Sequence, residues 1–447
     1  MNKSIDIEPS KQGKNLNRRD FLRNSAMAAA GAAVLPTMVN GAEAWDVKAT
    51  ETTHAPIRMG VIGIGIQCIG HIRHLMHRSD ARIMALCDVE SIRLNRAKDI
   101  VNEAYTKRFG KEARPVDTYE DFREMLKRTD IDAVLIATPT HWHACMSIMA
   151  ARTGKDIYCE KPMTLSIHEG RAMVDAMKRY NVIFQNGSQQ RSDAKFRLAC
   201  ELVRNGRIGK VKEIFINNVA DPSGPCYLPS EPIPPTINWD LWLGPAPWRG
   251  YNKILCPFDN WATFPNWRRY SDYDGGGMTD WGAHHFDIAQ WALGMDDSGP
   301  VTIIPPRESE YNRLTYVYAN GAKMIRGGAK PGEAGLEIIG EKGRVCVNRG
   351  YLMTEPDDLI RTKWGADDIH LYESNSHWNN FFDCVRERRQ CICNPEVGHR
   401  SSTVCHLGII CYRLDRTWNW DPVNEHFVND PEADRLMTKP SRAPWIV

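Results

Sequence analysis

Three polar side chains in two distant segments have the types needed to oxidise a secondary alcohol. They are Lys161, Asp280 and His284. Oxidation requires a base that takes the hydroxyl proton while a hydride leaves the carbon, and an imidazole with an unperturbed pKa near ~6.5 suits that role at neutral pH. An ammonium group holds the substrate oxygen and stabilises negative charge as it develops. We therefore predict that His284 is the acid/base and that Lys161 orients the substrate oxygen.

The spacing around His284 adds two carboxylates. Asp280 comes four residues before the histidine and Asp287 three residues after it, so on one continuous helix the three side chains share a face. This arrangement predicts that Asp280 orients the imidazole or binds a neighbouring hydroxyl, and it makes Asp287 a further candidate for substrate contact. His285 points to another face of the helix and is interpreted as structural.

A glycine turn indicates a dinucleotide site. Gly63 and Gly65 follow the apolar segment 57–62 and precede a helical stretch. Glycines allow a tight turn and a close approach of the backbone to a pyrophosphate, which the N–H groups at the start of the helix then hold. We expect the cofactor to bind at Gly63, Gly65, Ile66 and Gln67.

Asp88 supports this interpretation. It closes the second predicted strand 25 positions after Gly63, near the distance at which a carboxylate meets the adenosine ribose. Cys68 stands where the usual fingerprint has its third glycine. Because a carboxylate accepts hydrogen bonds from both ribose hydroxyls and repels a 2′-phosphate, Asp88 favours NAD over NADP.

Strands and helices alternate from residue 55 to about residue 185. Strands joined by helices of this length form a doubly wound parallel sheet, so this part is predicted to be a Rossmann domain. The expected strands are 57–62, 82–87, 133–137, 156–159 and 182–185. The expected helices include 120–128, 144–153 and 166–180.

The pattern changes in the remaining part, 186–447. Proline- and tryptophan-rich loops occupy 221–270, and the strand-like runs that accompany them have few helices between them, at 211–219, 314–318, 337–339 and 344–347. Such runs predict an α+β domain with a large open, mainly antiparallel sheet. Helices are expected at 378–389 and 403–416, and the turn-rich tail 419–447 is expected to wrap the surface.

Three motifs give the chain a resemblance to a known family. Residues 138–143 read Thr-Pro-Thr-His-Trp-His, residues 160–162 read Glu-Lys-Pro, and residues 275–287 combine three glycines with Asp-x-x-x-His. With these motifs the chain resembles the Gfo/Idh/MocA family of nicotinamide-dependent sugar and cyclitol oxidoreductases. The resemblance covers nearly all of the chain that follows Ala44.

The resemblance implies both a fold and a site. The first domain would be a Rossmann fold, and the open sheet of the second would cover the nicotinamide. The family's catalytic lysine, aspartate and histidine fall on Lys161, Asp280 and His284. Open sheets in this family often pair between subunits, so a homo-oligomer is expected. The cofactor site is expected to include Thr138, Pro139, His143, Glu160 and Lys161.

The aromatic side chains favour a carbohydrate substrate. Seven of the 14 tryptophans lie between residues 239 and 291, and flat rings offer apolar faces to the C–H sides of a sugar. Core packing is the alternative explanation for any single ring. Further candidates for substrate binding are Gln190, Arg191, Trp267 and Asp287.

Other ligands and partners are not expected. His141, His143, His284 and His285 lack the cysteine or carboxylate that would complete a metal-site spacing, so no metal is predicted. The chain has 57 basic and 55 acidic side chains, and without its first 44 residues it has 51 of each. A neutral body without a basic block does not indicate nucleic acid or an anionic membrane as a partner.

The first 44 residues resemble a twin-arginine export signal. Arg18 and Arg19 precede an apolar segment, 26–39, that is shorter than the roughly 20 residues needed to span a bilayer. A small-x-small site ends at Ala44, where we predict cleavage, followed by a linker, 45–54. The alternative is an ordinary tail with a chance arginine pair. Export predicts a periplasmic protein and the export machinery as a partner, without a stable membrane anchor.

Two further expectations follow from export. A protein that folds before export leaves its thiols reduced, so the 13 cysteines, which include no Cys-x-x-Cys pair, are expected to be mostly free. NAD would be loaded before export and stay tightly bound, and the hydride would pass to a second sugar. The alternatives are a redox-neutral glycosidase, whose known examples carry a differently arranged Tyr/His segment, and a non-catalytic sugar-binding protein.

Overall fold

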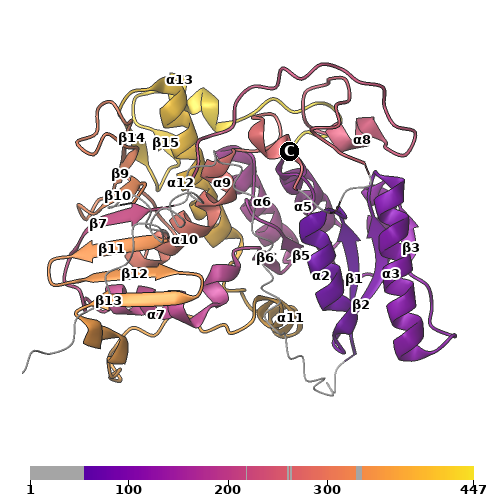
Figure 1. Ribbon diagram of the computed structural model, residues 1–447, viewed down its shortest axis with the longest axis horizontal. Helices are drawn as coiled ribbons and strands as arrows, with labels where there is room; N and C mark the ends of the chain where they lie inside the picture. Colours follow the sequence, from indigo (N-terminus) through magenta and orange to yellow (C-terminus); the bar gives the residue numbers. More distant parts are fainter. Residues whose placement is uncertain (1–54, 218, 259–260, 262–263, 329–334) are drawn as a thin grey trace, which may run out of the picture. The chain divides into compact units, whose positions relative to one another are not determined.

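The computed structural model describes residues 55–447 except 218, 259–260, 262–263 and 329–334 (Figure 1). The predicted export signal, its cleavage site and the linker lie outside the described residues. Two sheets organise the described chain. Figure 1 shows the larger sheet at the left and the smaller one at the right.

The smaller sheet is a Rossmann sheet. Its six strands are all parallel and follow the order β3-β2-β1-β4-β5-β6. Successive strands are added on one side of β1 up to β3 and on its other side from β4 onward, so the strand order switches between β1 and β4. The strands are β1 (Ile57–Ile62), β2 (Ala81–Cys87), β3 (Asp117–Tyr119), β4 (Ala133–Ile136), β5 (Asp156–Cys159) and β6 (Phe184–Asn186). The carboxyl ends of β1 and β4 therefore form the crevice in which such sheets place ligands.

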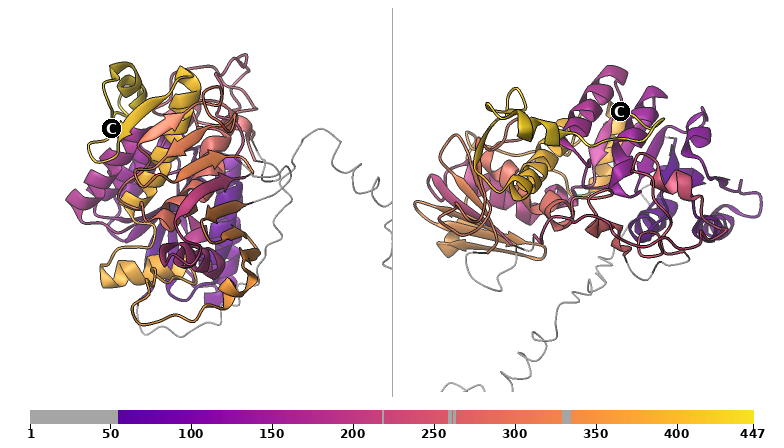
Figure 2. Two further views of the ribbon diagram at one scale, coloured as in Figure 1. Left: turned by 90° about the vertical axis from the view of Figure 1, so that its left-hand side faces the viewer. Right: turned by 90° about the horizontal axis from the view of Figure 1, so that it is seen from above.

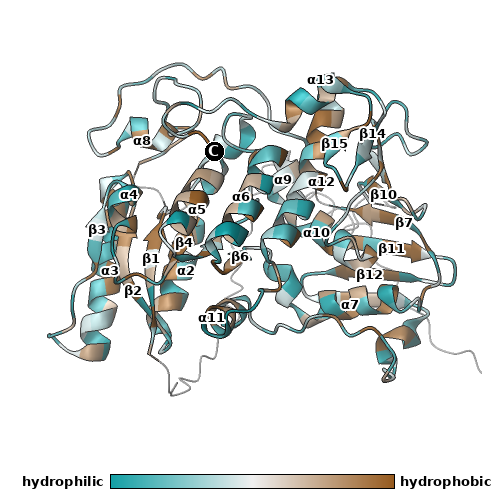
Figure 3. Cartoon of the chain, turned by 180° about the vertical axis from the view of Figure 1, so that it is seen from behind, coloured by the Kyte–Doolittle hydropathy of each residue, from teal (hydrophilic) through white to brown (hydrophobic). Residues whose placement is uncertain are grey.

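Helices cover this sheet and are held by local signals. They are α2 (Ile66–His77), α3 (Ser91–Phe109), α4 (Phe122–Leu126), α5 (His143–Arg152) and α6 (Ile167–Tyr180). The α6 helix begins with a capping box, in which the Ser166 side chain accepts from the Glu169 N–H and the Glu169 carboxylate accepts from the Ser166 N–H. In Figure 3 the strands of the sheet are mostly brown and the helices carry both colours, as expected for buried strands and amphipathic helices.

The larger sheet has nine strands and is mostly antiparallel. Its order is β13-β12-β11-β7-β10-β9-β8-β14-β15, and β7 and β10 form its one parallel pair among the described strands. The strands are β7 (Val211–Ile216), β8 (Thr302–Ile304), β9 (Thr315–Val317), β10 (Lys323–Arg326), β11 (Leu336–Gly340), β12 (Arg344–Asn348), β13 (Tyr351–Glu355), β14 (Trp418–Asp421) and β15 (His426–Phe427). The predicted fold class is confirmed.

One face of the larger sheet packs on helices. The α7 (Ala194–Arg204), α10 (Gly282–Leu293) and α12 (Pro395–Leu414) helices share a single hydrophobic core with the inward side chains of the strands. The α12 helix also lies against α6 of the Rossmann domain, and the right view in Figure 2 shows helices between the two sheets. The short helices α8 (Trp239–Leu243), α9 (Gly277–Asp280) and α13 (Pro431–Asp434) lie in the connecting loops and the tail.

Two segments that follow the Rossmann domain in the sequence pack into its core. The α11 helix (His377–Glu387) contributes Trp378, which stacks on Tyr158 of β5 with ring centroids 4.2 Å apart. Near the C-terminus, Trp445 packs edge-on against Trp142 at 4.8 Å. The expected division near residue 185 therefore describes the two sheets but not the packing, because later residues fill the first core.

Buried polar side chains made the start of the α12 helix unpredictable from the sequence. The α12 helix begins at Pro395, eight residues before the expected start at residue 403. Its first turns carry His399 and Arg400, which are buried against Glu425. Because buried charged pairs break the hydrophobic period, the sequence pattern did not mark this part as helical.

The cysteines are free, as expected. All 13 lie in the described part of the chain, and 11 of them are buried. Most fill apolar cores as small hydrophobic side chains. None of the described helices is both long and apolar enough to cross a membrane.

Candidate active site

Lys161 and Asp280 meet between the two domains. Lys161 follows the carboxyl end of β5, and Asp280 ends α9 of the second domain. The Lys161 ammonium donates to the Asp280 carboxylate in a short ion pair and to the Asp280 backbone oxygen at 2.9 Å. Burial alone would raise the pKa of Asp280, but the charges of Lys161 and Arg268 outweigh it and lower that pKa.

His284 lies beside this ion pair. The residue is 5% exposed, and burial together with the charges of Lys161 and Arg349 lowers its pKa well below the ordinary value for histidine. The imidazole is therefore neutral at physiological pH and has the form that accepts a proton. Its Nδ1 atom is buried without a hydrogen-bond partner in the described part of the chain.

Asp280 does not contact the His284 imidazole, so the prediction that it orients this ring is wrong. Asp280 closes α9, Trp281 forms a turn, and α10 begins at Gly282, so the two side chains do not share one regular helix. The Asp280 carboxylate binds Lys161 instead. Asp280 thus positions the ammonium group rather than the imidazole.

Arg191 and Asp287 are brought together, but away from solvent. Their side chains are each 1% exposed and lie 2.8 Å apart, and Arg191 also pairs with Asp296. Ser401 donates to the Asp287 carboxylate at 2.6 Å. Because their polar atoms are occupied by one another, this geometry favours a structural role over the expected contact with substrate.

The glycine turn has the shape that a dinucleotide requires. Gly63 adopts φ +84°, and a Cβ there would meet Thr138 at 2.7 Å. At Gly65 a Cβ would meet no atom within 4 Å, so the backbone borders open space. The α2 helix starts here without a side-chain cap or an acidic residue in its first turn, which leaves the N–H groups of Ile66 and Gln67 available to an anion.

Asp88 lies beside this turn. Its Oδ2 accepts from the Ile64 N–H at 2.6 Å, and its Oδ1 accepts from the Glu90 N–H at 2.8 Å. Each carboxylate oxygen keeps a second lone pair for a ribose hydroxyl. Thr138 lies opposite, and its Oγ1 is buried without a partner among the described residues. The residues present therefore fit a nicotinamide dinucleotide.

Glu160 is held by a relay that the sequence analysis missed. The Trp378 indole donates to His71 Nδ1 at 3.2 Å, so the His71 Nε2 carries the proton and donates to Glu160 Oε1 at 2.7 Å. Gln189 donates to the same oxygen at 3.0 Å. Burial would raise the pKa of Glu160, but the His71 contact and nearby charges lower it.

His143 and Thr140 connect the loops around the site. The His143 ring lies between two carbonyl oxygens, with Nδ1 2.8 Å from Pro162 and Nε2 3.0 Å from Thr138. It thereby ties the Thr138–Pro139 segment to the lysine loop. Thr140 donates to the buried Asp274 of the second domain at 3.0 Å.

Two arginines near the site gave no signal in the sequence. Arg268 stacks on Trp267 at 4.3 Å, and its charge lowers the pKa of Asp280. Arg349 lies over the Trp281 ring at 4.9 Å. Gln190, a predicted substrate residue, joins Arg349 to the site: its amide nitrogen donates to the His284 backbone oxygen at 3.0 Å, and its oxygen accepts from Arg349 Nε at 3.3 Å.

The tryptophans divide into packed and open rings. Trp239 stacks on Trp242 at 4.7 Å, and both belong to a buried cluster that contains Trp267. Trp267 is only 7% exposed, which favours packing over sugar contact. Trp281, between Asp280 and His284 in the site, is 39% exposed.

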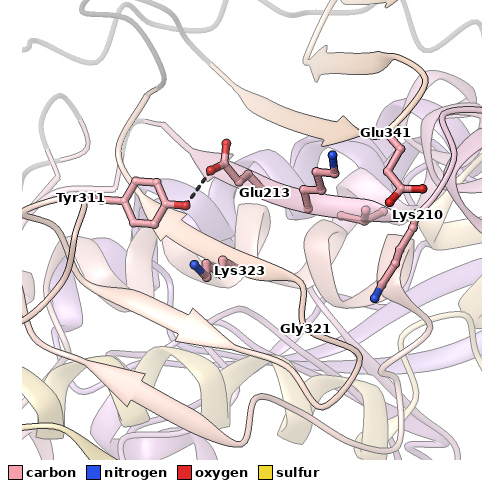
Figure 4. Close-up of a pocket in the computed structure, with 8 residues that line it drawn as sticks. Lys210, Glu213, Tyr311, Gly321, Lys323 and Glu341 are labelled. Atoms are coloured by element: carbon pink, nitrogen blue, oxygen red, sulfur yellow. Dashed lines mark hydrogen bonds between the residues drawn. The ribbon is translucent and has the colours of Figure 1, made fainter.

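A separate hollow lies on the larger sheet. It has a volume of 290 Å³ and is lined by residues of β7 and β10 with their neighbouring loops, including Lys210, Glu213, Tyr311 and Lys323 (Figure 4). Tyr311 donates to Glu213 at 2.5 Å. None of the predicted catalytic or cofactor residues lines it.

Family comparisons cover both domains. Residues 57–188 match the model described as "Oxidoreductase family, NAD-binding Rossmann fold" of GFO_IDH_MocA, and residues 210–447 match the model described as "Oxidoreductase family, C-terminal alpha/beta domain". The predicted NAD-binding Rossmann domain is thus supported by both fold and family.

Curated relatives match part of the chain. A glycosyl hydrolase family 109 protein from Shewanella pealeana is 29% identical over 208 residues, which are 44% of this chain and 44% of that protein. A myo-inositol 2-dehydrogenase from Thermotoga maritima is 32% identical over 169 residues, 38% of this chain and 47% of that protein. The chain spans less than half the length of these two relatives.

Solved structures match over more of the chain. The WlbA dehydrogenase from Bordetella pertussis, solved with NADH and UDP-GlcNAcA, has a TM-score of 0.58 at 18% identity. The match covers 83% of this chain and 99% of that chain. A likeness at this identity supports the fold.

Proposed function

The chain belongs to the Gfo/Idh/MocA oxidoreductase family, and from this premise we propose that it moves a hydride between NAD and a secondary hydroxyl of a sugar, glycoside or cyclitol. The observation that carries the proposal is the Lys161–Asp280 ion pair, formed across the domains beside a neutral His284. NAD supplies the hydride acceptor when bound, held by the glycine turn, the α2 N-terminus and Asp88. The residues of the chain supply the proton chemistry and the orientation.

The roles follow from charge and protonation. The neutral imidazole of His284 takes the hydroxyl proton during oxidation and returns it during reduction. The Lys161 ammonium donates to the substrate oxygen and stabilises its developing negative charge. Asp280 holds the ammonium in place, and Glu160 accepts a hydrogen bond from the Lys161 backbone N–H at 3.2 Å.

The cofactor stays bound through turnover, and the protein acts after export. The paired Arg18 and Arg19 and the small-x-small sequence that ends at Ala44 support this part of the proposal. Free NAD is scarce outside the cytoplasm, so the bound nucleotide is restored by a second sugar. A keto-sugar accepts the hydride from bound NADH, or a sugar donates a hydride to bound NAD. The test is to purify the exported form and extract its nucleotide. Recovery of protein without nucleotide that turns over added NAD would contradict tight binding.

A redox-neutral glycosidase is the second candidate. The observation that favours it is the match to glycosyl hydrolase family 109 proteins. In that reaction the oxidised ring carbon acidifies the neighbouring C–H, the aglycone is eliminated, water adds, and the hydride returns to the sugar. A neutral base such as His284 would take the C–H proton.

One experiment separates the two candidates. Purified protein is incubated with matched glycosides and free sugars while absorbance of reduced nicotinamide and release of aglycone are followed together. Oxidoreductase activity gives absorbance or a keto-sugar without aglycone, whereas the glycosidase releases aglycone without net reduction. Lys161→Met should lower either activity by about 10²- to 10³-fold, and Lys210→Met, at the separate hollow, is the matched control. Full activity of Lys161→Met would contradict both candidates.

A further inference from the structure

A cation near the candidate active site, Arg349, has no ion-pair partner among the described residues. Lys161 has Asp280 as its partner, and Glu160 is satisfied by His71 and Gln189. Arg349 has no ion pair with a carboxylate among the described residues and lies close enough for its charge to lower the pKa of His284. Arg349 is therefore a cation beside the catalytic groups that forms no ion pair among the described residues.

The Arg349 side chain is held in one orientation. It comes from the turn between β12 and β13 and places its guanidinium over the Trp281 ring. Gln190 accepts from its Nε, which leaves the two Nη groups without a hydrogen bond in the part of the chain that the structure describes. A guanidinium fixed through its ring contact and its Nε presents a free fork to a planar oxyanion.

Protein atoms surround part of the Arg349 side chain. The residue is exposed to solvent, yet burial is the largest cause of its lowered pKa. The negative charges of Asp193 and Glu160 act on Arg349 only from a distance. Placing a cation there costs free energy that a bound anion would offset.

The cofactor phosphates have their own site. The glycine turn and the α2 N-terminus belong to the Rossmann domain, whereas Arg349 contacts Gln190 and Trp281 next to His284. Arg349 thus lies beside His284 and not at the glycine turn.

We propose that Arg349 is the anion-binding part of the substrate site, so that the preferred sugar carries a carboxylate or phosphate oxyanion on a carbon other than the one oxidised. This inference rests on the proposed function, because it describes the same site. Trp281, the partly exposed ring beneath the guanidinium, flanks the sugar.

The test compares matched charged and neutral sugars. Holoenzyme is assayed with glucuronate, galacturonate and mannuronate, with the three parent hexoses, and with the hexose 6-phosphates. Charged hydrogen bonds contribute about 1.5–3 kcal/mol, so we expect KM to be roughly 10- to 150-fold lower for a charged sugar than for its neutral parent. The uronates and the phosphates distinguish a carboxylate subsite from a phosphate subsite.

The variants separate specificity from chemistry. Arg349→Gln should raise KM for the charged sugars by the same factor and change KM for the neutral sugars much less. Arg349→Lys should recover part of the affinity. Arg361→Gln, which changes an exposed arginine outside the candidate active site, is the control and should have no effect. Equal effects on charged and neutral sugars, or a preference for neutral sugars, would overturn the inference.

Binding distinguishes failure of the inference from failure of the proposed function. Calorimetric titration of the holoenzyme with each uronate and each phosphate requires no turnover. Binding that Arg349→Gln abolishes, without oxidation of any sugar, would support the anion subsite and contradict the proposed reaction. If no charged sugar binds in an Arg349-dependent way while neutral sugars are oxidised, the subsite is wrong and the proposed function stands.

Discussion

The Lys161 ammonium donates to both the carboxylate and the backbone oxygen of Asp280. The lysine comes from the Rossmann domain and the aspartate from the second domain, so one side chain joins the two halves of the candidate site. An isolated lysine in this position would sample several rotamers. The paired one has a fixed direction, which is what orientation of a substrate oxygen requires.

A double-mutant cycle tests this pairing. Lys161→Met should lower kcat/KM by about 10²- to 10³-fold, the magnitude typical for loss of a group that stabilises developing charge. Asp280→Asn should lower it by less, because the ammonium remains but loses its partner. The double variant should be no worse than Lys161→Met alone, since Asp280 acts through the lysine. Strictly additive losses would show that Asp280 acts independently.

The protonation of His284 sets the pH dependence of oxidation. Burial and the charges of Lys161 and Arg349 lower its pKa well below the ordinary value, so the neutral, proton-accepting form persists as pH falls through 6.5. We expect kcat/KM for oxidation to show no loss with an apparent pKa near 6.5 assignable to this residue. His284→Gln should lower kcat/KM by about 10²- to 10⁴-fold, whereas His370→Gln, an exposed control, should not. A profile that declines with a pKa near 6.5 and loses this limb in His284→Gln would contradict the assignment.

Two glycines should respond differently to alanine. Gly63→Ala forces a Cβ against Thr138 at a positive φ, so thermal unfolding should begin at a lower temperature. Gly65→Ala meets no protein atom, and Gly65 has φ −88°, which alanine adopts freely, so Tm should be unchanged. Its methyl group would instead crowd the nucleotide, at a cost of about 1–3 kcal/mol, or roughly 5- to 150-fold in the Kd for NAD. Unchanged NAD affinity of Gly65→Ala would place the nucleotide elsewhere.

The buried carboxyl of Asp274 should make stability depend on pH. Burial, with the charge of Asp280 adding to it, raises the pKa of Asp274 to about 6. The folded protein then binds the proton more tightly than the unfolded chain, so stability falls as pH rises from about 4 to about 6 and stays reduced above that range.

Asp274→Asn isolates this effect. At pH 7.5 it should raise the free energy of unfolding by on the order of 2–3 kcal/mol, the free-energy equivalent of a shift of about two pKa units. At pH 4 it should have no such effect. The side-chain oxygen of asparagine still accepts from Thr140 and Thr279, so these hydrogen bonds are retained. Denaturant unfolding at the two pH values, with exposed Asp367→Asn as the control, measures the difference. Equal effects at both pH values would exclude a charge-based cause.

The parts of the site that lie on regular elements were predictable from the sequence. Gly63, Asp88 and Lys161 follow the carboxyl ends of three strands of a parallel sheet, so an alternating pattern of strands and helices already places them at one edge. The motif resemblance selected Asp280 and His284. Their helix spacing was misleading because the chain breaks at Trp281, a turn that side-chain periodicity does not reveal.

Side chains from remote turns were not predictable in this way. Arg349 lies 188 residues after Lys161 and stands in an ordinary hairpin turn, where a charged residue is unremarkable. Trp378 looked like one core aromatic among many, yet it orients His71 and, through it, Glu160. Such roles arise only after distant segments pack together.

By itself, the sequence determined the fold class and the glycine turn, because these depend on local periodicity and on residue types at strand and helix ends, and the motif resemblance predicted the reacting groups. Only the tertiary structure decided which partner each charge takes. Asp280 binds Lys161 and not His284, Asp287 binds Arg191, and Arg349 faces the site without a carboxylate partner among the described residues. The physical reason is that electrostatic pairing and desolvation depend on distances between elements, which strand and helix patterns in a single chain do not encode.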